Sequence, residues 1–229
     1  MVRDPGTTRA RLVAAAEVLF AARGIDAVSL REINREAGAR NAVAVQYHFS
    51  DRSGVVRAIL AKHQPDVDRL RHAELDVLDA IRAPDLRSLA GALVRPLAAK
   101  LTDLDGGAAY LQVYADVVNR PRPLLDAPRA DDDEQPDSVQ RWRLAVEPLL
   151  APNAMRLHRR FTAIRFVAAE LGRRAASGPH TDDRLFVSHL VDLTTAVLGA
   201  PVSEETVQRA DERDLHRRRA PAAPTPHEG

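Results

Sequence analysis

The fold of this chain is decided by one stretch of sequence, VSLREINREAGARNAVAVQYHFSDR at residues 28–52. Ser29 has the side-chain oxygen that caps a helix N-terminus, and Glu32 three residues later completes a capping box. Val28 before the cap and Ile33 after it predict a hydrophobic staple. This pattern predicts a sharply defined helix start at Ser29.

A tight turn and a second short helix are expected next. Gly38 provides the positive φ that a sharp change of direction requires. The following helix is expected from Asn41 to about Tyr47. Two short helices joined by a glycine turn, with a third helix before them, are typical of a helix-turn-helix, whose second helix can enter the major groove. The same spacing also fits an ordinary helical hairpin without a DNA partner.

Most of the remaining chain is predicted to be helical, because apolar residues recur every three or four positions. One helix is expected over 53–62, and it is expected to bend or break near Pro65 and to continue to residue 78. Further helices are expected over 85–101, 108–119, 137–150, 153–176 and 181–198. The predicted fold class is all-α. It has an N-terminal three-helix helix-turn-helix domain at 7–52 and a larger helical domain at 53–205, to which the family resemblance described below assigns DNA binding and ligand binding with dimerisation, respectively. Residues 121–136 are expected to form a solvated loop and residues 206–229 a disordered tail.

The net charge of the whole chain argues at first against a nucleic-acid partner. The 229 residues contain 33 Lys and Arg against 32 Asp and Glu, which gives a formal net charge of +1. Residues 1–60, however, contain nine Arg and six acidic residues, giving +3, and the remainder carries −2. A positive N-terminal part and a negative remainder are expected if only the N-terminal part contacts DNA phosphates.

Several other classes of protein are not indicated. The absence of cysteine excludes a disulfide scaffold and a cysteine-ligated metal site. No stretch has the length and composition of a membrane span or a signal peptide, so we expect a cytoplasmic protein with no membrane partner. His63-x-x-Asp66 and His72-x-x-x-Asp76 each pair two metal-ligand types, but no third ligand stands at a diagnostic spacing. Without a catalytic or nucleotide-binding fingerprint, we expect no enzymatic activity, no metal and no cofactor.

Several motifs follow one another in the first sixty residues. They are Thr8-Arg9, Ala15-Ala16-Glu17-Val18-Leu19-Phe20, Gly24, Val28-Ser29-Leu30-Arg31-Glu32-Ile33, Ala37-Gly38 and Tyr47-His48-Phe49-Ser50-Asp51-Arg52. In this order they closely resemble the N-terminal domain of the TetR family of transcriptional regulators. The resemblance covers about residues 7–60 and is only architectural beyond them. It implies a helical C-terminal domain that binds a small-molecule effector and dimerises.

The resemblance also implies where DNA contacts lie. From Gly38 to Phe49 the chain has one residue more than the commonest family spacing, so we count the recognition helix backwards from His48-Phe49. Val45 then falls in a buried position, and Asn41 matches the polar start of the recognition helix. The candidate DNA-binding residues are Ser29, Arg40, Asn41, Ala42, Val43, Gln46, Tyr47, His48 and Arg52.

The residues around the recognition helix suit base edges. Arg40, Asn41 and Gln46 are the best candidates, since Arg suits guanine and Asn or Gln suits adenine. Ala42 and Val43 would either meet thymine methyl groups or only allow a close approach. The lengthened turn leaves the exact base contacts open.

Four other residues suit phosphates. Ser29 offers a hydroxyl beside backbone N–H groups at a helix N-terminus, in addition to its capping role. The family uses the positions of Tyr47 and His48 for phosphate contacts. Arg52 stands where the family usually has Lys, so the positive charge is kept.

The C-terminal part has candidates for a ligand pocket and for a dimer interface. The pocket candidates are Tyr110, Tyr114, Trp142, His158 and Phe161, although such residues at helical spacing are more often plain core. The interface candidates recur at spacings of three and four, and they fit either intramolecular packing or the family's four-helix bundle with a second subunit. They are Phe161, Ile164, Ala168 and Leu171 in one helix and Phe186, Leu190, Leu193 and Val197 in the next.

These observations predict a TetR-like, ligand-responsive transcriptional regulator. We expect a repressor that binds a palindromic double-stranded DNA operator as a homodimer and is released by a small-molecule inducer. The alternative is a helical small-molecule-binding or dimerisation protein that does not bind DNA.

Overall fold

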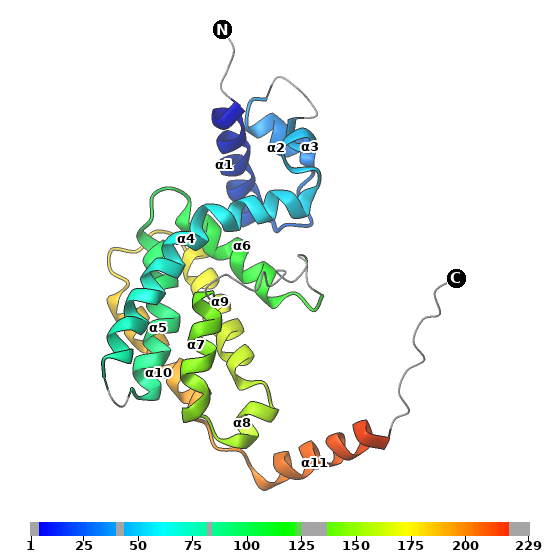
Figure 1. Ribbon diagram of the computed structural model, residues 1–229. Helices are drawn as coiled ribbons and strands as arrows, with labels where there is room; N and C mark the ends of the chain where they lie inside the picture. Colours follow the sequence, from blue (N-terminus) through cyan, green and yellow to red (C-terminus); the bar gives the residue numbers. More distant parts are fainter. Residues whose placement is uncertain (1–4, 40–43, 82–83, 123, 125–136, 220–229) are drawn as a thin grey trace.

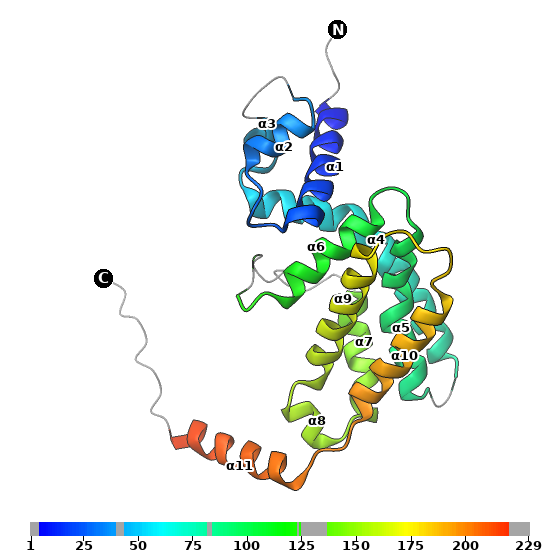
Figure 2. The same ribbon diagram turned by 180° about the vertical axis from the view of Figure 1, so that it is seen from behind.

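The computed structural model describes residues 5–39, 44–81, 84–122, 124 and 137–219. These residues form helices joined by short connections, and none of them lies in a strand. Figures 1 and 2 show a small head at one end, a larger helical body in the middle and a single helix at the other end. The predicted all-α fold class, with an N-terminal helix-turn-helix and a larger helical part, is confirmed.

The head contains α1 (Pro5–Arg23), α2 (Leu30–Glu36) and α3 (Ala44–Phe49). Gly24 ends α1 with a φ of 82°, and its N–H donates to the carbonyl of Phe20 at 2.8 Å. The head is held together by fully or nearly fully buried apolar side chains, which are Leu12, Ala16, Phe20, Ile25, Val28, Ile33 and Val45.

Helix α4 (Arg52–Asp79) belongs to both the head and the body. It starts beneath α1–α3 and then turns down along the body (Figure 1). The sequence predicted a helix bent or broken near Pro65, and α4 is one continuous helix with Pro65 inside it. The predicted domain boundary between residues 52 and 53 therefore lies at the start of a shared helix.

The body is a bundle in which α6 packs against α9, and α5 packs against both α4 and α10. Its elements are α5 (Leu86–Ala98), η1 (Ala99–Thr102), α6 (Gly107–Asn119), α7 (Ser138–Val146), η2 (Glu147–Leu149), α8 (Pro152–Arg156), α9 (Arg159–Ala176) and α10 (Arg184–Gly199). The single helix predicted over 153–176 is wrong. His158 has a φ of 54°, a left-handed conformation that separates α8 from α9.

The disordered tail predicted from residue 206 is not found in the described part, because α11 (Glu204–Arg219) is helical. Acidic residues lie in its first turn and arginines near its end, which complements the helix dipole. Arg156 of α8 pairs with Asp211 and Asp214 of α11 at 2.9 and 2.7 Å. Helix α11 extends away from the body at the end opposite to the head (Figures 1 and 2). Residues 220–229 lie outside the described residues.

Within the described ranges, no single helix has the length and apolar composition needed to cross a bilayer. Only α10 and α11 taken together, with a bend of 60° between them, reach that length and composition.

Candidate nucleic-acid interface

The N-terminus of α2 is fixed by the predicted capping box, which is confirmed. The hydroxyl of Ser29 accepts the backbone N–H of Glu32 at 3.3 Å, and the carboxylate of Glu32 accepts the backbone N–H of Ser29 at 2.8 Å. Arg23 binds the other carboxylate oxygen at 2.7 Å. The Ser29 N–H and the Arg23 guanidinium together lower the pKa of Glu32 to about 2. Ser29 is exposed, so it can face a phosphate while it caps the helix.

The position of α3 relative to α2 depends on a buried polar contact that the sequence did not reveal. The side-chain oxygen of Asn34 accepts the backbone N–H of Val45 at 3.1 Å, and both residues are buried. Gly38 between the helices has the predicted positive φ, at 58°. Arg11 of α1 donates to the carbonyl of Ala37 at the end of α2. These contacts fix the angle between α2 and α3.

Helix α3 has one buried face and one exposed face. Ala44, Val45 and Phe49 are buried, and the burial of Val45 was predicted. Gln46 is exposed, and Tyr47 is 82% exposed, which is unusual for an aromatic side chain. The exposed face of α3 is therefore available to a partner.

Tyr47 and His48 lie in the last turn of α3, which ends at Phe49, two residues beyond the helix end expected from the sequence. Their rings meet edge to face with centroids 5.2 Å apart. Four predicted contacts, Arg40, Asn41, Ala42 and Val43, lie outside the described residues. The described part of the recognition helix begins at Ala44.

Arg52 connects the first turn of α4 to the segment before α2. Its Nη2 donates to the carbonyl of Val28 at 3.1 Å, and its Nη1 lies 3.8 Å from a carboxylate oxygen of Asp26. Its Nε is buried and has no hydrogen-bond partner in the structure. The side chain is 38% exposed and lies beside the residue that precedes Ser29. Arg52 therefore serves packing and still presents positive charge near the α2 N-terminus.

The corner between α3 and α4 leaves no room for a side chain at Gly54. A Cβ atom at this position would lie 1.9 Å from the carbonyl oxygen of Phe49. Asp51 caps α4 by accepting the N–H of Gly54 at 2.7 Å, and Ser50 has a φ of 64°. The sequence analysis did not single out Gly54, because the close approach depends on how the two helices meet.

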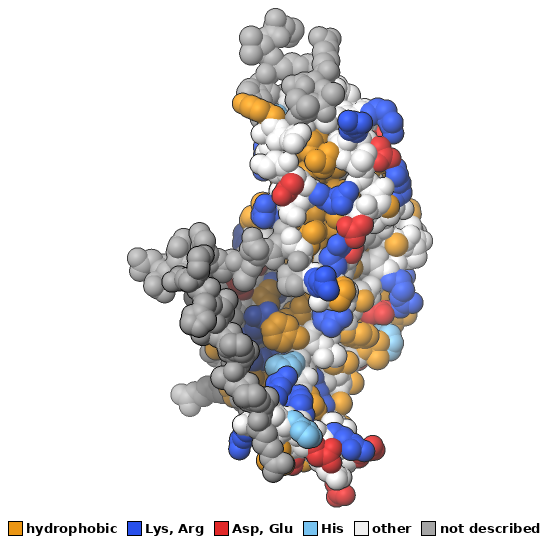
Figure 3. Space-filling model, turned by 90° about the vertical axis from the view of Figure 1, so that its right-hand side faces the viewer, with side chains coloured by type: hydrophobic (Ala, Val, Ile, Leu, Met, Phe, Trp, Pro, Cys, Tyr) orange, Lys and Arg blue, Asp and Glu red, His pale blue; other side chains and the backbone are white. Residues whose placement is uncertain are grey.

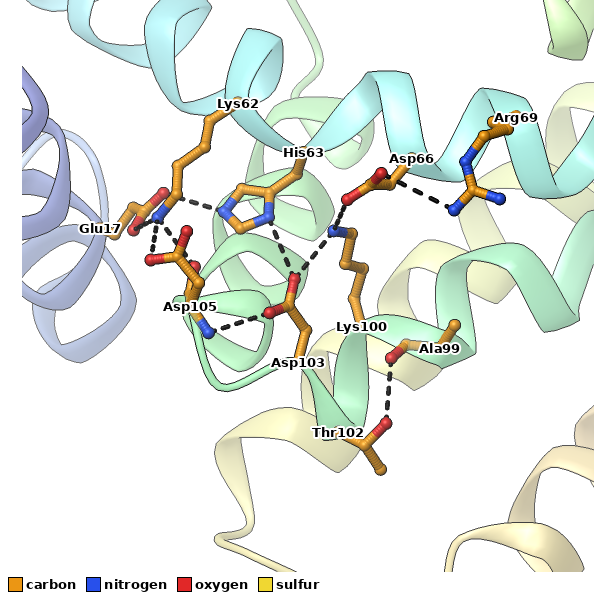
Figure 4. A network of polar contacts seen from close by, with 10 residues as sticks. All are labelled: Glu17, Lys62, His63, Asp66, Arg69, Ala99, Lys100, Thr102, Asp103 and Asp105. Atoms are coloured by element: carbon orange, nitrogen blue, oxygen red, sulfur yellow. Dashed lines mark hydrogen bonds and ion pairs between the residues drawn. The ribbon is translucent and has the colours of Figure 1, made fainter.

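A polar cluster connects the head to the body (Figure 4). Glu17 of α1 is 2% exposed, and its two carboxylate oxygens bind His63 at 2.9 Å and Lys62 at 3.0 Å, both on α4. Lys62 also binds the carboxylate of Asp105 at 3.0 Å. Burial opposes the charge of Lys62, but its hydrogen bonds to Glu17 and Asp105 raise its pKa.

The cluster continues from α4 into the body. The second ring nitrogen of His63 lies 3.7 Å from Asp103, and the His63 ring stacks on Tyr110 with centroids 4.6 Å apart. Lys100 binds Asp103 at 2.8 Å, which is the main reason why the pKa of Asp103 is lowered. We call Glu17, Lys62, His63, Lys100, Asp103 and Asp105 the Glu17 joint. It links α1, α4 and the segment from η1 to α6.

The two histidine–aspartate pairs of the sequence have protein partners. His63 belongs to the Glu17 joint, and Asp66 binds Lys100 at 3.2 Å. Arg141 lies 3.3 Å from His72 and binds Asp76 at 2.7 Å. Among the described residues there is no group of three potential metal ligands.

The five predicted pocket residues do not form one cluster. Tyr110 and Tyr114 of α6 lie together, with ring centroids 5.8 Å apart, and His158 and Phe161 lie together at 6.4 Å. Trp142 is fully buried and donates to the carbonyl of Leu89 at 2.8 Å, which directs it toward α5.

The described residues also form two surface grooves of about 570 Å³ each, away from the predicted pocket residues. One lies between α5 and the start of α10, and the other lies between α1 and α4. None of the five predicted pocket residues lines either groove. In the first, Arg87 is paired with Asp192 at 2.9 Å and Arg95 with Glu74 at 2.8 Å.

Four of the eight predicted dimer residues, Ile164, Ala168, Leu171 and Leu190, are buried within the body. Phe186 and Val197 are partly buried and pack against the core. Phe161 and Leu193 are exposed by 48% and 38%, and Leu185 of α10 is exposed by 83%. The buried residues serve intramolecular packing, and the exposed ones are apolar side chains on the surface of α9 and α10.

Comparison with known proteins gives a family match for the head. Residues 12–59 match the family of bacterial regulatory proteins, tetR family. The match includes most of α1, all of α2 and α3, and the first two turns of α4. No curated protein matches the chain. Among solved structures, the chain is similar to a TetR-family regulator from Streptomyces coelicolor A3, with 19% identity and a TM-score of 0.40 over 86% of this chain and 99% of that one.

Proposed function

We propose that this chain, whose residues 12–59 match the tetR family of bacterial regulatory proteins, is a transcriptional repressor that is released from DNA by a small molecule. The observation that carries the proposal is the arrangement of α3. Its buried side is fixed by Val45 and Phe49, and its free side presents Gln46 and Tyr47. A short helix held rigidly with polar side chains outward suits a major groove. A DNA partner also implies a cytoplasmic location.

In this proposal the contacts divide into two kinds. Gln46, together with Arg40, Asn41, Ala42 and Val43, meets base edges, since amide side chains pair with adenine and Arg pairs with guanine. Phosphates are bound by Ser29 before α2, by Tyr47 and His48 in the last turn of α3, and by Arg52 in the first turn of α4. Ser29 supports this division, because it is exposed at a helix N-terminus where backbone N–H groups favour an anion.

We infer that two copies associate through α9 and α10. Leu185 and Leu193 of α10 are exposed apolar side chains that a second copy would cover. A two-fold dimer would place two recognition helices about 34–36 Å apart, or a multiple of that distance, on one face of DNA. The operator would then be palindromic.

In this proposal the effector releases the regulator from DNA by shifting the population between two conformations. DNA selects one separation of the two heads, and an effector that binds better to another separation weakens the DNA complex. Helix α4 and the Glu17 joint are the connections that would transmit this change, because they hold α1 against the body through buried polar contacts.

The alternative function is a helical small-molecule-binding or dimerisation protein whose helix-turn-helix is only a scaffold. Selection of bound sites from a pool of random duplexes tests the two. We expect an enriched inverted repeat with the half-site spacing given above. Gln46→Ala should change the preferred base at one position of each half-site, whereas Glu36→Ala, on the exposed side of α2, should not. Failure to enrich any sequence at low salt would favour the alternative.

A further inference from the structure

Arg71 is a buried arginine in the body with few partners. It belongs to α4 and is 1% exposed. Its Nη1 donates to the hydroxyl of Ser138 at 2.6 Å, and that hydroxyl donates in turn to Asp68. Its ion pair with Asp68 is loose, at 3.6 Å, and its Nε is buried without any hydrogen-bond partner in the structure.

A guanidinium has five N–H donors and stays charged in proteins. Buried charges are normally paired and hydrogen-bonded, because desolvation without compensation is costly. Burial indeed lowers the pKa of Arg71. Among the described residues, the guanidinium donates one hydrogen bond, to Ser138, and its buried Nε has no acceptor.

The groups around Arg71 suit an organic anion. Tyr110 and Tyr114 of α6 lie together with ring centroids 5.8 Å apart, and α6 packs against α4, which carries Arg71. Burial raises the pKa of both tyrosines, and the positive charge of Arg71 opposes this rise. Arg143 of α7 also acts on Tyr114, and its own Nε is buried without a hydrogen-bond partner. Two arginines with unused donors thus lie near Tyr114. Among the described residues, the carboxylates that interact with Arg71 are Asp68, which is 40% exposed, Asp137, which caps α7, and Glu74, which is paired with Arg95 at 2.8 Å.

An apolar surface adjoins these cations. The guanidinium of Arg143 lies 4.7 Å from the ring centroid of Phe161, which is 48% exposed. Figure 3 views the molecule from the side on which α6, α7 and α8 lie, and it shows hydrophobic and basic side chains together in a hollow of the body. This combination of apolar lining and few polar groups is typical of small-molecule sites.

We propose that Arg71 binds the acidic group of the effector, which is a small carboxylic acid whose apolar part lies against Tyr114 and Phe161. A carboxylate accepts charge-assisted hydrogen bonds from a guanidinium, and the buried Nε of Arg71 is a donor without an acceptor among the described residues. The inference rests on the proposed function, because it names the chemical class of the effector. In this proposal one ligand contacts both Tyr114 and Phe161, which were predicted from the sequence and lie in two separate ring pairs.

The test uses matched probes and the fluorescence of Trp142, which is the one tryptophan of the sequence and directly precedes Arg143. The probes are 4-phenylbutanoate and octanoate, each compared with its uncharged amide. We expect both carboxylates to change the Trp142 emission saturably and to raise Tm, and the amides to bind at least about tenfold more weakly, as the loss of a charge-assisted hydrogen bond implies. Equal binding of acids and amides, or binding of neither acid, would overturn the inference.

Variants separate a ligand role from a structural one. Arg71→Met should weaken both carboxylates about tenfold or more and leave the amides unchanged. Arg69→Met is the matched control, since Arg69 lies on the same helix with a side chain 69% exposed, and it should change neither. Arg71→Met should not lower Tm, because an apolar side chain replaces a poorly satisfied buried charge. A clear fall in Tm with unchanged carboxylate binding would assign Arg71 a structural role.

Operator binding, measured with the same preparations without probe, keeps the two proposals apart. If wild-type protein binds a selected duplex but no carboxylate, only the Arg71 inference fails. If it binds carboxylates but no duplex, the DNA proposal fails and the anion site remains.

Discussion

Replacing Glu17 tests the connection between head and body. In Glu17→Leu, Lys62 and His63 lose the carboxylate that now lies 3.0 and 2.9 Å from them. Removing one partner of a buried pair typically costs about 3–5 kcal/mol. Because Lys62 is 24% exposed and would still pair with Asp105, we expect a loss of unfolding free energy at the lower end of this range, about 3 kcal/mol. For a chain of this size that lowers Tm by about 6–12 °C.

Glu17→Gln is the conservative variant, because its amide oxygen can accept from Lys62 and its amide nitrogen can donate to His63. It should cost about 1 kcal/mol, which corresponds to about 2–4 °C. Glu36→Leu removes an exposed carboxylate of α2 and is the control, with an expected change near zero. Thermal unfolding followed by circular dichroism measures all three. A Tm for Glu17→Leu within about 2 °C of the control would refute the role of the joint.

Three further predictions concern the head. Arg52→Ala should weaken binding to all duplexes and reduce the salt slope of log K by about 1, measured by fluorescence anisotropy, and an unchanged slope would count against a phosphate contact. The pKa of Glu32 is about 2 in the folded chain against an ordinary 4.5, so its stabilisation is present above pH 4.5 and is lost as pH falls toward 2. Acid unfolding of Glu32→Gln should therefore depend less on pH in this interval, and an identical profile would contradict the capping account. Gly54→Ala should destabilise the chain by about 1–3 kcal/mol, because the added Cβ would meet the Phe49 carbonyl oxygen. Gly199→Ala is the control, because its Cβ would make only an ordinary contact. Equal midpoints of denaturant unfolding for the two variants would show that the backbone between α3 and α4 can move to accept the side chain.

Features that depend on neighbouring residues could be predicted from the sequence. The capping box at Ser29 needs only residues three positions apart. The burial of Val45 was predicted from the family resemblance, with the helix counted backwards from His48-Phe49. Gly38 has the positive φ expected at a tight turn.

Features that depend on distant residues could not be predicted. Glu17 reads as a surface position of α1 and becomes buried only because α4 brings Lys62 and His63, 45 and 46 residues away, against it. The same holds for Asn34, whose partner Val45 is placed by the turn between them. Arg71 reads as one arginine among many, and only its burial distinguishes it from Arg69.

Two errors concern helix continuity. The apolar pattern runs through His158 without interruption, so the break between α8 and α9 was not visible in it. The polar composition of residues 204–219 suggested disorder, because it has little apolar surface to bury. Helix α11 forms with a favourable charge order, and Arg156 binds two of its aspartates.

The account depends most on the claim that the head binds DNA through α3. The direct test is the affinity of the full chain for a selected palindromic duplex and for a scrambled duplex of the same composition, measured from low to high salt. We predict tighter binding to the palindrome at every salt concentration and a linear fall of log K with log salt. Absence of binding to either duplex at low salt would contradict the account.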